Sequence, residues 1–277
     1  TVAGPSSPPM PSTYAWLMLL LGSVVLAIVM RGRILALPAS EPPSSPTPPV
    51  TTGLFAAMIV LGPLGATLGV ALAGAPDGGA RSLRSMAIIS ICAYAAQLPA
   101  AAAYVWLRRP ATPRSAASLF AGAAIGVALL VGVWPLVVVV TEFGAVLQHR
   151  LSGRALDPLA HETLRALRDA PGGPWPRVVT ALAILAAPIV EEILYRGMGQ
   201  SIARQAGFRP WTAIVLVSAF FAIMHAAVVP VPALAGLFVL ALGLGWAREA
   251  TGGLTAPIVA HVGFNAANLM IASGMTG

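Results

Sequence analysis

The sequence predicts an all-α membrane protein, a polytopic helical bundle of about eight transmembrane spans. Of its 277 residues, 57% are hydrophobic and only 9% are charged, and the mean hydropathy is +0.84. A soluble domain carries about 25% charged residues, so this composition excludes an ordinary soluble fold. The apolar residues also fall into successive runs of about 20 residues, the length of helix that crosses a bilayer.

The first 50 residues divide into three parts. Residues 1–13 carry no charge and are rich in proline and serine, which indicates a disordered tail. The apolar run at 14–30 has its arginines after it rather than before it, so we interpret it as a retained span within residues 14–37, not as a cleaved signal peptide. Residues 38–50 are dense in proline and form a semi-rigid linker that tethers this first span.

Seven further apolar runs follow the linker. Spans 2–4 occupy residues 51–140, and spans 5–8 occupy residues 177–277. Residues 141–176 between them are more polar, and their leucines alternate with charged residues, which predicts an interfacial amphipathic segment. The seven runs are Thr52–Ala75, Met86–Leu107, Ser115–Val140, Arg177–Gly199, Pro210–Val229, Val231–Ala250 and Leu254–Ser273.

The net charge of +7 comes from arginine alone, because the chain contains no lysine. The arginines are scattered between apolar runs, so no nucleic-acid partner is expected, and they serve instead to orient the spans against the lipid bilayer. Their distribution favours a topology with both termini outside. The lack of lysine, with dense alanine, arginine and proline, indicates a multi-pass protein of a bacterial inner membrane. The one cysteine, Cys92, cannot form an internal disulfide.

Three ionisable side chains lie within one predicted span, Arg177–Gly199. A charge at the centre of a bilayer costs roughly 2.5–3.5 kcal/mol, so Glu191, Glu192 and Arg196 must face protein or water. Arg196 follows Glu192 by four residues, the spacing of an ion pair, whereas Glu191 points about 100° away toward another neighbour. Pro188 frees backbone groups in the same helix. On these residues alone, an ion pair that only locks helices together is an alternative.

Two other spans carry polar side chains. His225 lies in the sixth span, and Phe221, four residues earlier, is expected to stack on its ring. In the eighth span His261, Asn265 and Asn268 line one face, which must point into the bundle. Each of these residues, taken singly, is more typical of a hydrogen bond between helices than of a functional site.

Together these side chains have the composition of a hydrolytic site. Glu191 can take a proton from water, and His225 can hold that water and transfer the proton. His261 and Asn265 can donate hydrogen bonds to a developing oxyanion, each typically worth about 3–4 kcal/mol. A serine nucleophile is disfavoured, because the serines of these spans have no obvious adjacent base.

The segment APIVEEILYRG at 187–197 resembles the EExxxR motif of the CPBP family, which contains the intramembrane type II CAAX prenyl endopeptidases and bacteriocin-processing proteins. FAIMH at 221–225 resembles the family's FxxxH motif, and HVGFN at 261–265 resembles its HxxxN motif, in the same order. The resemblance covers about residues 175–273. Tyr195 is a small departure, since the family commonly has phenylalanine there.

The resemblance implies an all-helical bundle with a site inside the membrane and an endopeptidase activity carried by a catalytic core at 177–277. It makes Glu191 the base, His225 its partner, and His261 and Asn265 the oxyanion donors. The supporting residues are Glu192, Arg196, Phe221 and Asn268. The expected partner is a membrane-embedded peptide or protein substrate, and a prenylated protein is not expected in a bacterium.

The sequence allows a catalytic zinc site but favours a metal-free one. Two histidines and a glutamate match the ligand count of a catalytic zinc site, and the family was long labelled as metalloproteases. No HExxH pair exists in the chain, however, and the family's structures favour water activated directly by glutamate and histidine. We therefore expect no metal cofactor; if the protein is zinc-dependent, Glu191, His225 and His261 would be the ligands.

Two other functions stay open at this point. A non-catalytic membrane scaffold or immunity-type protein could use the same fold to hold a partner, although the retention of every polar motif residue argues against an inactive site. A transporter with a proton relay would place broken helices in both halves of the chain, whereas the ionisable residues within spans fall in the second half.

Overall fold

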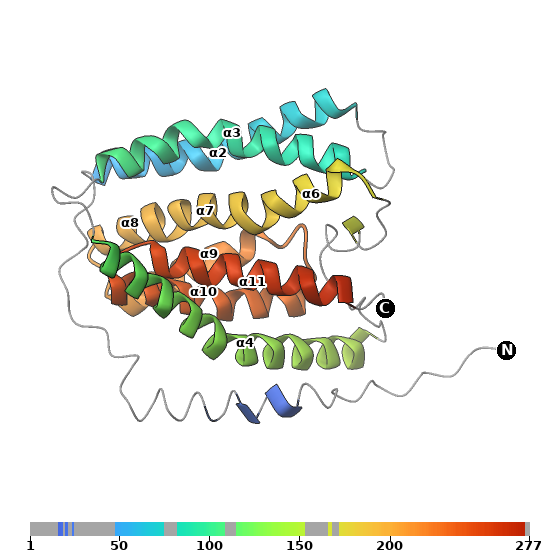
Figure 1. Cartoon of the computed structure of the whole chain (residues 1–277). Coiled ribbons are helices and arrows are strands. Elements are labelled where there is room, and N and C mark those ends of the chain that lie inside the picture. Colours follow the sequence, from blue (N-terminus) through green and yellow to red (C-terminus); the bar gives the residue numbers. More distant parts are fainter. Residues whose placement is uncertain are drawn as a thin grey trace.

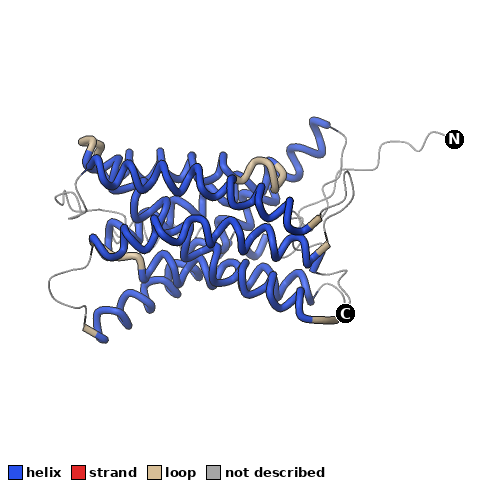
Figure 2. The backbone as a smooth tube through the Cα atoms, turned by 90° about the horizontal axis from the view of Figure 1, so that it is seen from above, coloured by secondary structure: helices blue, strands red, loops and turns tan. Residues whose placement is uncertain are grey.

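The structure is a computed structural model that describes residues 48–74, 82–108, 115–152 and 172–274, with isolated positions at 16–18, 20–21, 24 and 166–167. The predicted tail at 1–13, most of the first span and of the proline-rich linker, and the centre of the interfacial segment lie outside the described residues. Within the described ranges every regular element is a helix (Figure 2), which confirms the all-α prediction.

An antiparallel pair of helices forms one side of the bundle (Figure 1). These are α2 (Pro48–Ala73) and α3 (Leu83–Leu107). They approach so closely that a Cβ atom on Gly69 would lie 2.6 Å from the Cα atom of Ile89. Glycine permits this contact, and close packing is what holds helices together where lipid gives them no hydrophobic reason to associate.

The next element is a long helix, Pro174–Gln205, that changes its hydrogen-bonding register along its length; we call it the central helix. Its segments are α6 (Pro174–Ala181), the π-helical η1 (Leu182–Ala186), α7 (Ala187–Glu191), the π-helical η2 (Glu192–Gly199) and α8 (Gln200–Gln205). Extended π-helical segments are rare, and single π-turns occur often at functional sites. The register changes alone therefore make this helix a candidate for carrying the functional site.

The central helix lies between two layers of helices, as Figure 1 shows. The α2–α3 pair covers one side of it. The helices on the other side are α9 (Pro210–Met224), α10 (Val231–Thr251) and α11 (Thr255–Gly274), with α4 (Ala116–Ser152) packed against α10 and α11. The charged residues of the central helix are thus surrounded by protein on both sides.

Among the described residues, five helices are long and apolar enough to cross a membrane: α2, α3, α4, the central helix and α10. The span predicted at 210–229 is the shorter apolar helix α9, and the span predicted at 254–273 is α11. α4 continues past its predicted end at Val140 to Ser152, so the first part of the predicted interfacial segment extends this helix. α2 begins at Pro48, inside the predicted linker.

Polar side chains link the central helix to α10 at every fourth residue, and we call these contacts the polar ladder. They are Arg196 Nη2 to the Ala241 carbonyl oxygen (3.3 Å), Gln200 Nε2 to the Gly245 carbonyl oxygen (3.0 Å) and to Glu249 Oε1 (2.7 Å), and Arg204 Nε to Glu249 Oε2 (3.5 Å). Because both helices advance by four residues from one contact to the next, they run parallel.

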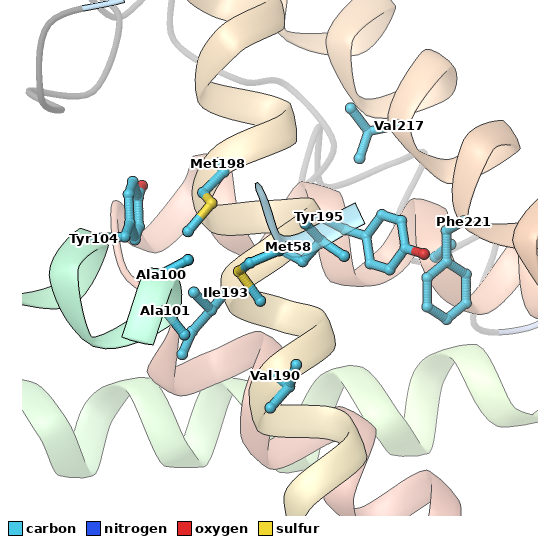
Figure 3. Close-up of a cluster of buried hydrophobic side chains, with 12 residues drawn as sticks. Met58, Ala100, Ala101, Tyr104, Val190, Ile193, Tyr195, Met198, Val217 and Phe221 are labelled. Atoms are coloured by element: carbon cyan, nitrogen blue, oxygen red, sulfur yellow. The ribbon is translucent and has the colours of Figure 1, made fainter. Parts of the chain in front are cut away.

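The largest buried cluster forms where the central helix meets α2, α3 and α9 (Figure 3). Tyr195 and Phe221 meet edge to face there, with ring centroids 5.0 Å apart. At another edge of the cluster the Tyr104 hydroxyl donates a hydrogen bond to the Gly197 carbonyl oxygen at 2.6 Å. This bond fixes the position of α3 along the central helix.

Candidate active site

Glu191 ends α7, and its carboxylate faces two histidines from two other parts of the chain. Oε1 lies 3.9 Å from His225 Nε2, and Oε2 lies 3.8 Å from His261 Nε2. The side chains of Glu191 and His225 are 22% and 21% exposed, whereas that of His261 is 4% exposed. The site is therefore accessible on the His225 side of the carboxylate and closed on the His261 side.

One oxygen of Glu192 accepts two hydrogen bonds. The donors are Arg196 Nη1 at 2.9 Å and His261 Nδ1 at 2.8 Å. Both Glu192 and Arg196 are fully buried, so each depends on the other for its charge to be compensated. The predicted pairing of Glu192 with Arg196, and the prediction that Glu191 faces other neighbours, are confirmed.

Phe221 contacts the buried ion pair and both histidines of the site. The Arg196 guanidinium carbon lies 4.7 Å from the Phe221 ring centroid, close enough for a cation–π contact. The same ring lies 4.5 Å from the His225 ring and 5.9 Å from the His261 ring. The predicted stacking of Phe221 on His225 is confirmed, and the ring contacts the second histidine as well.

His225 lies directly after α9, where the helix ends at Met224. Its Nδ1 donates a hydrogen bond to the Phe221 carbonyl oxygen at 2.8 Å, since a carbonyl can only accept. In the neutral ring Nε2 then carries a lone pair and faces Glu191. The 3.9 Å between Nε2 and Oε1 is too long for a direct hydrogen bond, but it is a separation that one water can bridge.

His261 is oriented by the same chemistry from the opposite side. Its Nδ1 donates to the Glu192 carboxylate, which leaves Nε2 facing Glu191. A neutral His261 would present a lone pair there, and only the imidazolium form donates from both nitrogens. The predicted role of His261 as an oxyanion donor therefore requires the charged ring.

Asn265 is placed by a gap in the backbone hydrogen bonds of the central helix. In η1 the Ala187 N–H bonds to the Leu182 carbonyl, five residues back. The next donor in that register would be Pro188, which has no N–H, so the Ala183 carbonyl is left without a partner from the helix. Asn265 Nδ2 donates to that oxygen at 2.8 Å and uses one of its two hydrogens.

Asn268 does not join the other predicted residues. Its Nδ2 donates to the Phe264 carbonyl of its own helix at 2.9 Å. A single turn of α11 thus separates an asparagine that reaches the central helix from one that bonds within α11.

The arrangement of the possible ligand side chains bears on the zinc alternative. Across residues 48–274, as far as the structure describes them, no group of three or more His, Cys, Asp or Glu side chains has an arrangement that could hold a metal ion. The metal-free site stays a prediction, to be tested with a chelator.

Two groups on or beside the central helix have no signal in the sequence motifs. One is the backbone carbonyl of Ala183, which becomes available through the π-helical register. The other is Tyr94 of α3, which packs against the cluster where α3 meets the central helix. Neither could be found from motif spacing, because the first depends on backbone register and the second on packing between distant helices.

The fold and these contacts define a polytopic helical membrane protein that holds a carboxylate–histidine cluster in its interior. Residues 173–267, that is 95 of the 277, match the family model described as type II CAAX prenyl endopeptidase Rce1-like. This match confirms the resemblance inferred from the three motifs, and it indicates a membrane-embedded protease. No curated protein and no solved structure matches the chain.

Proposed function

We propose that this chain is an intramembrane endopeptidase that hydrolyses a peptide bond with water activated by Glu191 and His225, without a metal cofactor. The observation that carries the proposal is the convergence of two histidine Nε2 atoms on the Glu191 carboxylate, inside the segment that matches the protease family. A carboxylate and an imidazole are the common general acid–base groups of enzymes.

The geometry supports a simple sequence of proton transfers. A water between Glu191 Oε1 and His225 Nε2 donates one hydrogen bond to each, which aims an oxygen lone pair at the substrate carbonyl carbon. Glu191 takes a proton as the water oxygen attacks, and the protonated carboxyl then gives that proton to the leaving amine. His225 keeps the water oriented, because its Nδ1 is held by the Phe221 carbonyl.

The oxyanion that forms in this step needs hydrogen-bond donors. Asn265 Nδ2 keeps one hydrogen after bonding to Ala183, and His261 in its imidazolium form offers Nε2–H. Glu192 and Arg196 act indirectly, since Glu192 orients His261 and Arg196 compensates the buried Glu192 charge.

The depth of the site indicates the kind of substrate. Glu191 is the 18th residue of the 32-residue central helix, counted from Pro174, and therefore lies near its middle. A peptide bond can reach this depth only if the substrate is itself embedded in the membrane or enters it. We therefore expect a membrane-embedded peptide or protein as substrate.

The test is proteolysis by the full chain in detergent or liposomes, with a library of membrane peptides read by mass spectrometry. Wild type is compared with Glu191→Gln and His225→Ala, each with and without a chelator. Both variants are expected to lose cleavage by about 100-fold or more, since general acid–base groups contribute about 10²–10⁴-fold. Glu142→Gln, which removes a carboxylate of α4, a helix packed against α10 and α11, is the matched control and is expected to cleave like wild type.

Each outcome has a defined meaning. Cleavage that survives the chelator and is lost in both variants supports the proposal. Cleavage lost with chelator and restored by zinc overturns the metal-free part. A folded wild type that cleaves nothing in a broad library overturns the peptidase and favours the scaffold.

A further inference from the structure

Tyr94 lies on α3, outside the segment that matches the protease family, and on the helix face that meets the central helix. Tyr94, Ala101 and Tyr104 are separated by seven and three residues, so they share that face. Ala101 and Tyr104 are buried in the large cluster, and Tyr94 packs against the same cluster. The face therefore points at protein rather than at lipid.

The register between the two helices sets the depth of Tyr94. Figure 1 shows α3 and the central helix running in the same direction. The Tyr104 hydroxyl bonds to Gly197, so Tyr94, ten residues earlier, lies level with the part of the central helix about ten residues before Gly197. That part is α7, which α3 contacts and which ends at Glu191.

The hydroxyl of Tyr94 is available for a ligand. Within the part of the chain that the structure describes, it makes no hydrogen bond, and the side chain is only partly buried. A tyrosine hydroxyl inside a membrane protein normally has a partner, as Tyr104 on the same face has in Gly197.

The proposed site also needs such a donor. His261 presents Nε2–H only as an imidazolium, and Asn265 has already committed one of its hydrogens to Ala183. A phenol O–H is a neutral donor that requires no change of charge in the site. It is also the kind of group that oxyanion holes use.

We propose that the Tyr94 hydroxyl donates a hydrogen bond to the carbonyl oxygen of the bond being cleaved, and is a catalytic residue supplied by α3. This inference rests on the proposed endopeptidase function. The hydroxyl keeps its proton throughout, and its hydrogen bond strengthens as negative charge develops on the substrate oxygen.

The experiment compares Tyr94→Phe with Tyr104→Phe, which remove one hydroxyl each from the same face of α3. The substrate is the peptide that wild type cleaves best in the membrane-peptide library. Tyr94→Phe is expected to lower kcat about 100-fold with little change in KM, because removing one oxyanion donor typically costs 10²–10³-fold. Tyr104→Phe removes the hydrogen bond but keeps the ring packed against Gly197, so the register is kept; it is expected to lower Tm and leave kcat within about twofold.

A second readout separates this role from a structural one. The same peptide with a phosphinate in place of the cleaved bond presents a tetrahedral anion to the site. Tyr94→Phe should weaken binding of the phosphinate by about the same factor by which it lowers kcat. Binding of the uncleaved parent peptide is measured in the inactive Glu191→Gln protein, and adding Tyr94→Phe to that protein should leave the affinity for the peptide unchanged.

The outcomes distinguish the two proposals. Normal kcat in Tyr94→Phe, with Glu191→Gln inactive, overturns the role of Tyr94 and leaves the endopeptidase intact. A raised KM with unchanged kcat overturns it as well, since the hydroxyl would then bind substrate and transition state equally. A folded wild type that cleaves nothing in the library overturns both.

Discussion

The α2–α3 pair and the central helix are both apolar enough to cross a membrane, yet they contact their neighbours in different ways. In the most apolar windows of α2 and α3, 22% and 17% of the residues are buried by protein, against 44% in the central helix. The pair is joined by backbone contact at Gly69 and by a hydrogen bond from Gln97 Nε2 to the Met58 carbonyl at 2.9 Å.

The central helix adds polar and charged contacts to the apolar cluster that it shares with α2, α3 and α9. Glu192 binds Arg196 and His261, and the polar ladder connects three of its turns to α10. Charged side chains are tolerated in this helix because protein lies on both of its sides, so they contact polar groups of other helices and not lipid. The contrast shows that ionisable residues, rather than overall hydropathy, identify the helix that the bundle encloses.

The largest loss of stability is expected from Arg196→Leu, in the region held by charged side chains. It leaves the buried Glu192 carboxylate without its cation, and breaking a buried ion pair costs about 3–5 kcal/mol. The measurement is the free energy of unfolding in detergent, from SDS titration followed by circular dichroism. The double variant with Glu192→Leu should recover part of the loss, because it removes the uncompensated charge; an Arg196→Leu protein as stable as wild type would contradict this account.

A smaller effect is expected from Gly69→Ala in the α2–α3 pair. The new methyl would meet the backbone of Ile89, which cannot move aside as a side chain can, and overpacking of this kind costs about 1–3 kcal/mol. Gly53→Ala is the matched control, since its Cβ would meet nothing within 4 Å, and it should be neutral or stabilising by up to about 1 kcal/mol. Equal unfolding free energies for the two variants would contradict the view that close backbone packing stabilises the contact between α2 and α3.

The smallest effect is expected from Gln97→Met. It removes the hydrogen bond to the Met58 carbonyl while keeping the length of the side chain, and hydrogen bonds between membrane helices average about 0.6 kcal/mol. The same SDS titration measures it, and peptide cleavage should be unchanged. A loss as large as that of Arg196→Leu would mean that polar contacts matter equally in both regions.

Much of the central helix could be predicted from the sequence. The four-residue spacing of Glu192 and Arg196 predicted their ion pair. The rotation of about 100° between consecutive helical residues predicted that Glu191 faces other neighbours. The stacking of Phe221 on His225 followed from the same local rule. These predictions succeeded because residues four apart stay on nearly the same face of a helix, even where η2 changes to the π-helical register.

The contacts that the sequence did not predict are those between helices. The hydrogen bond from His261 to Glu192 joins residues 69 positions apart, and nothing local specifies it. Asn265 and Asn268 look equivalent as polar residues on one face, and only the unpaired Ala183 carbonyl separates them. Tyr94 lies far from every motif, so its position depends on the register that Tyr104 sets between two helices.

Pro188 has a consequence for the composition of a neighbouring helix. One carbonyl, that of Ala183, can be served either by a backbone N–H at position 188 or by the amide of Asn265, and the imino acid at 188 removes the first donor. The two positions therefore constrain each other. An ordinary amino acid at 188 could give this carbonyl a backbone donor of its own, so a residue without an amide at 265 would be tolerated best when 188 is no longer proline.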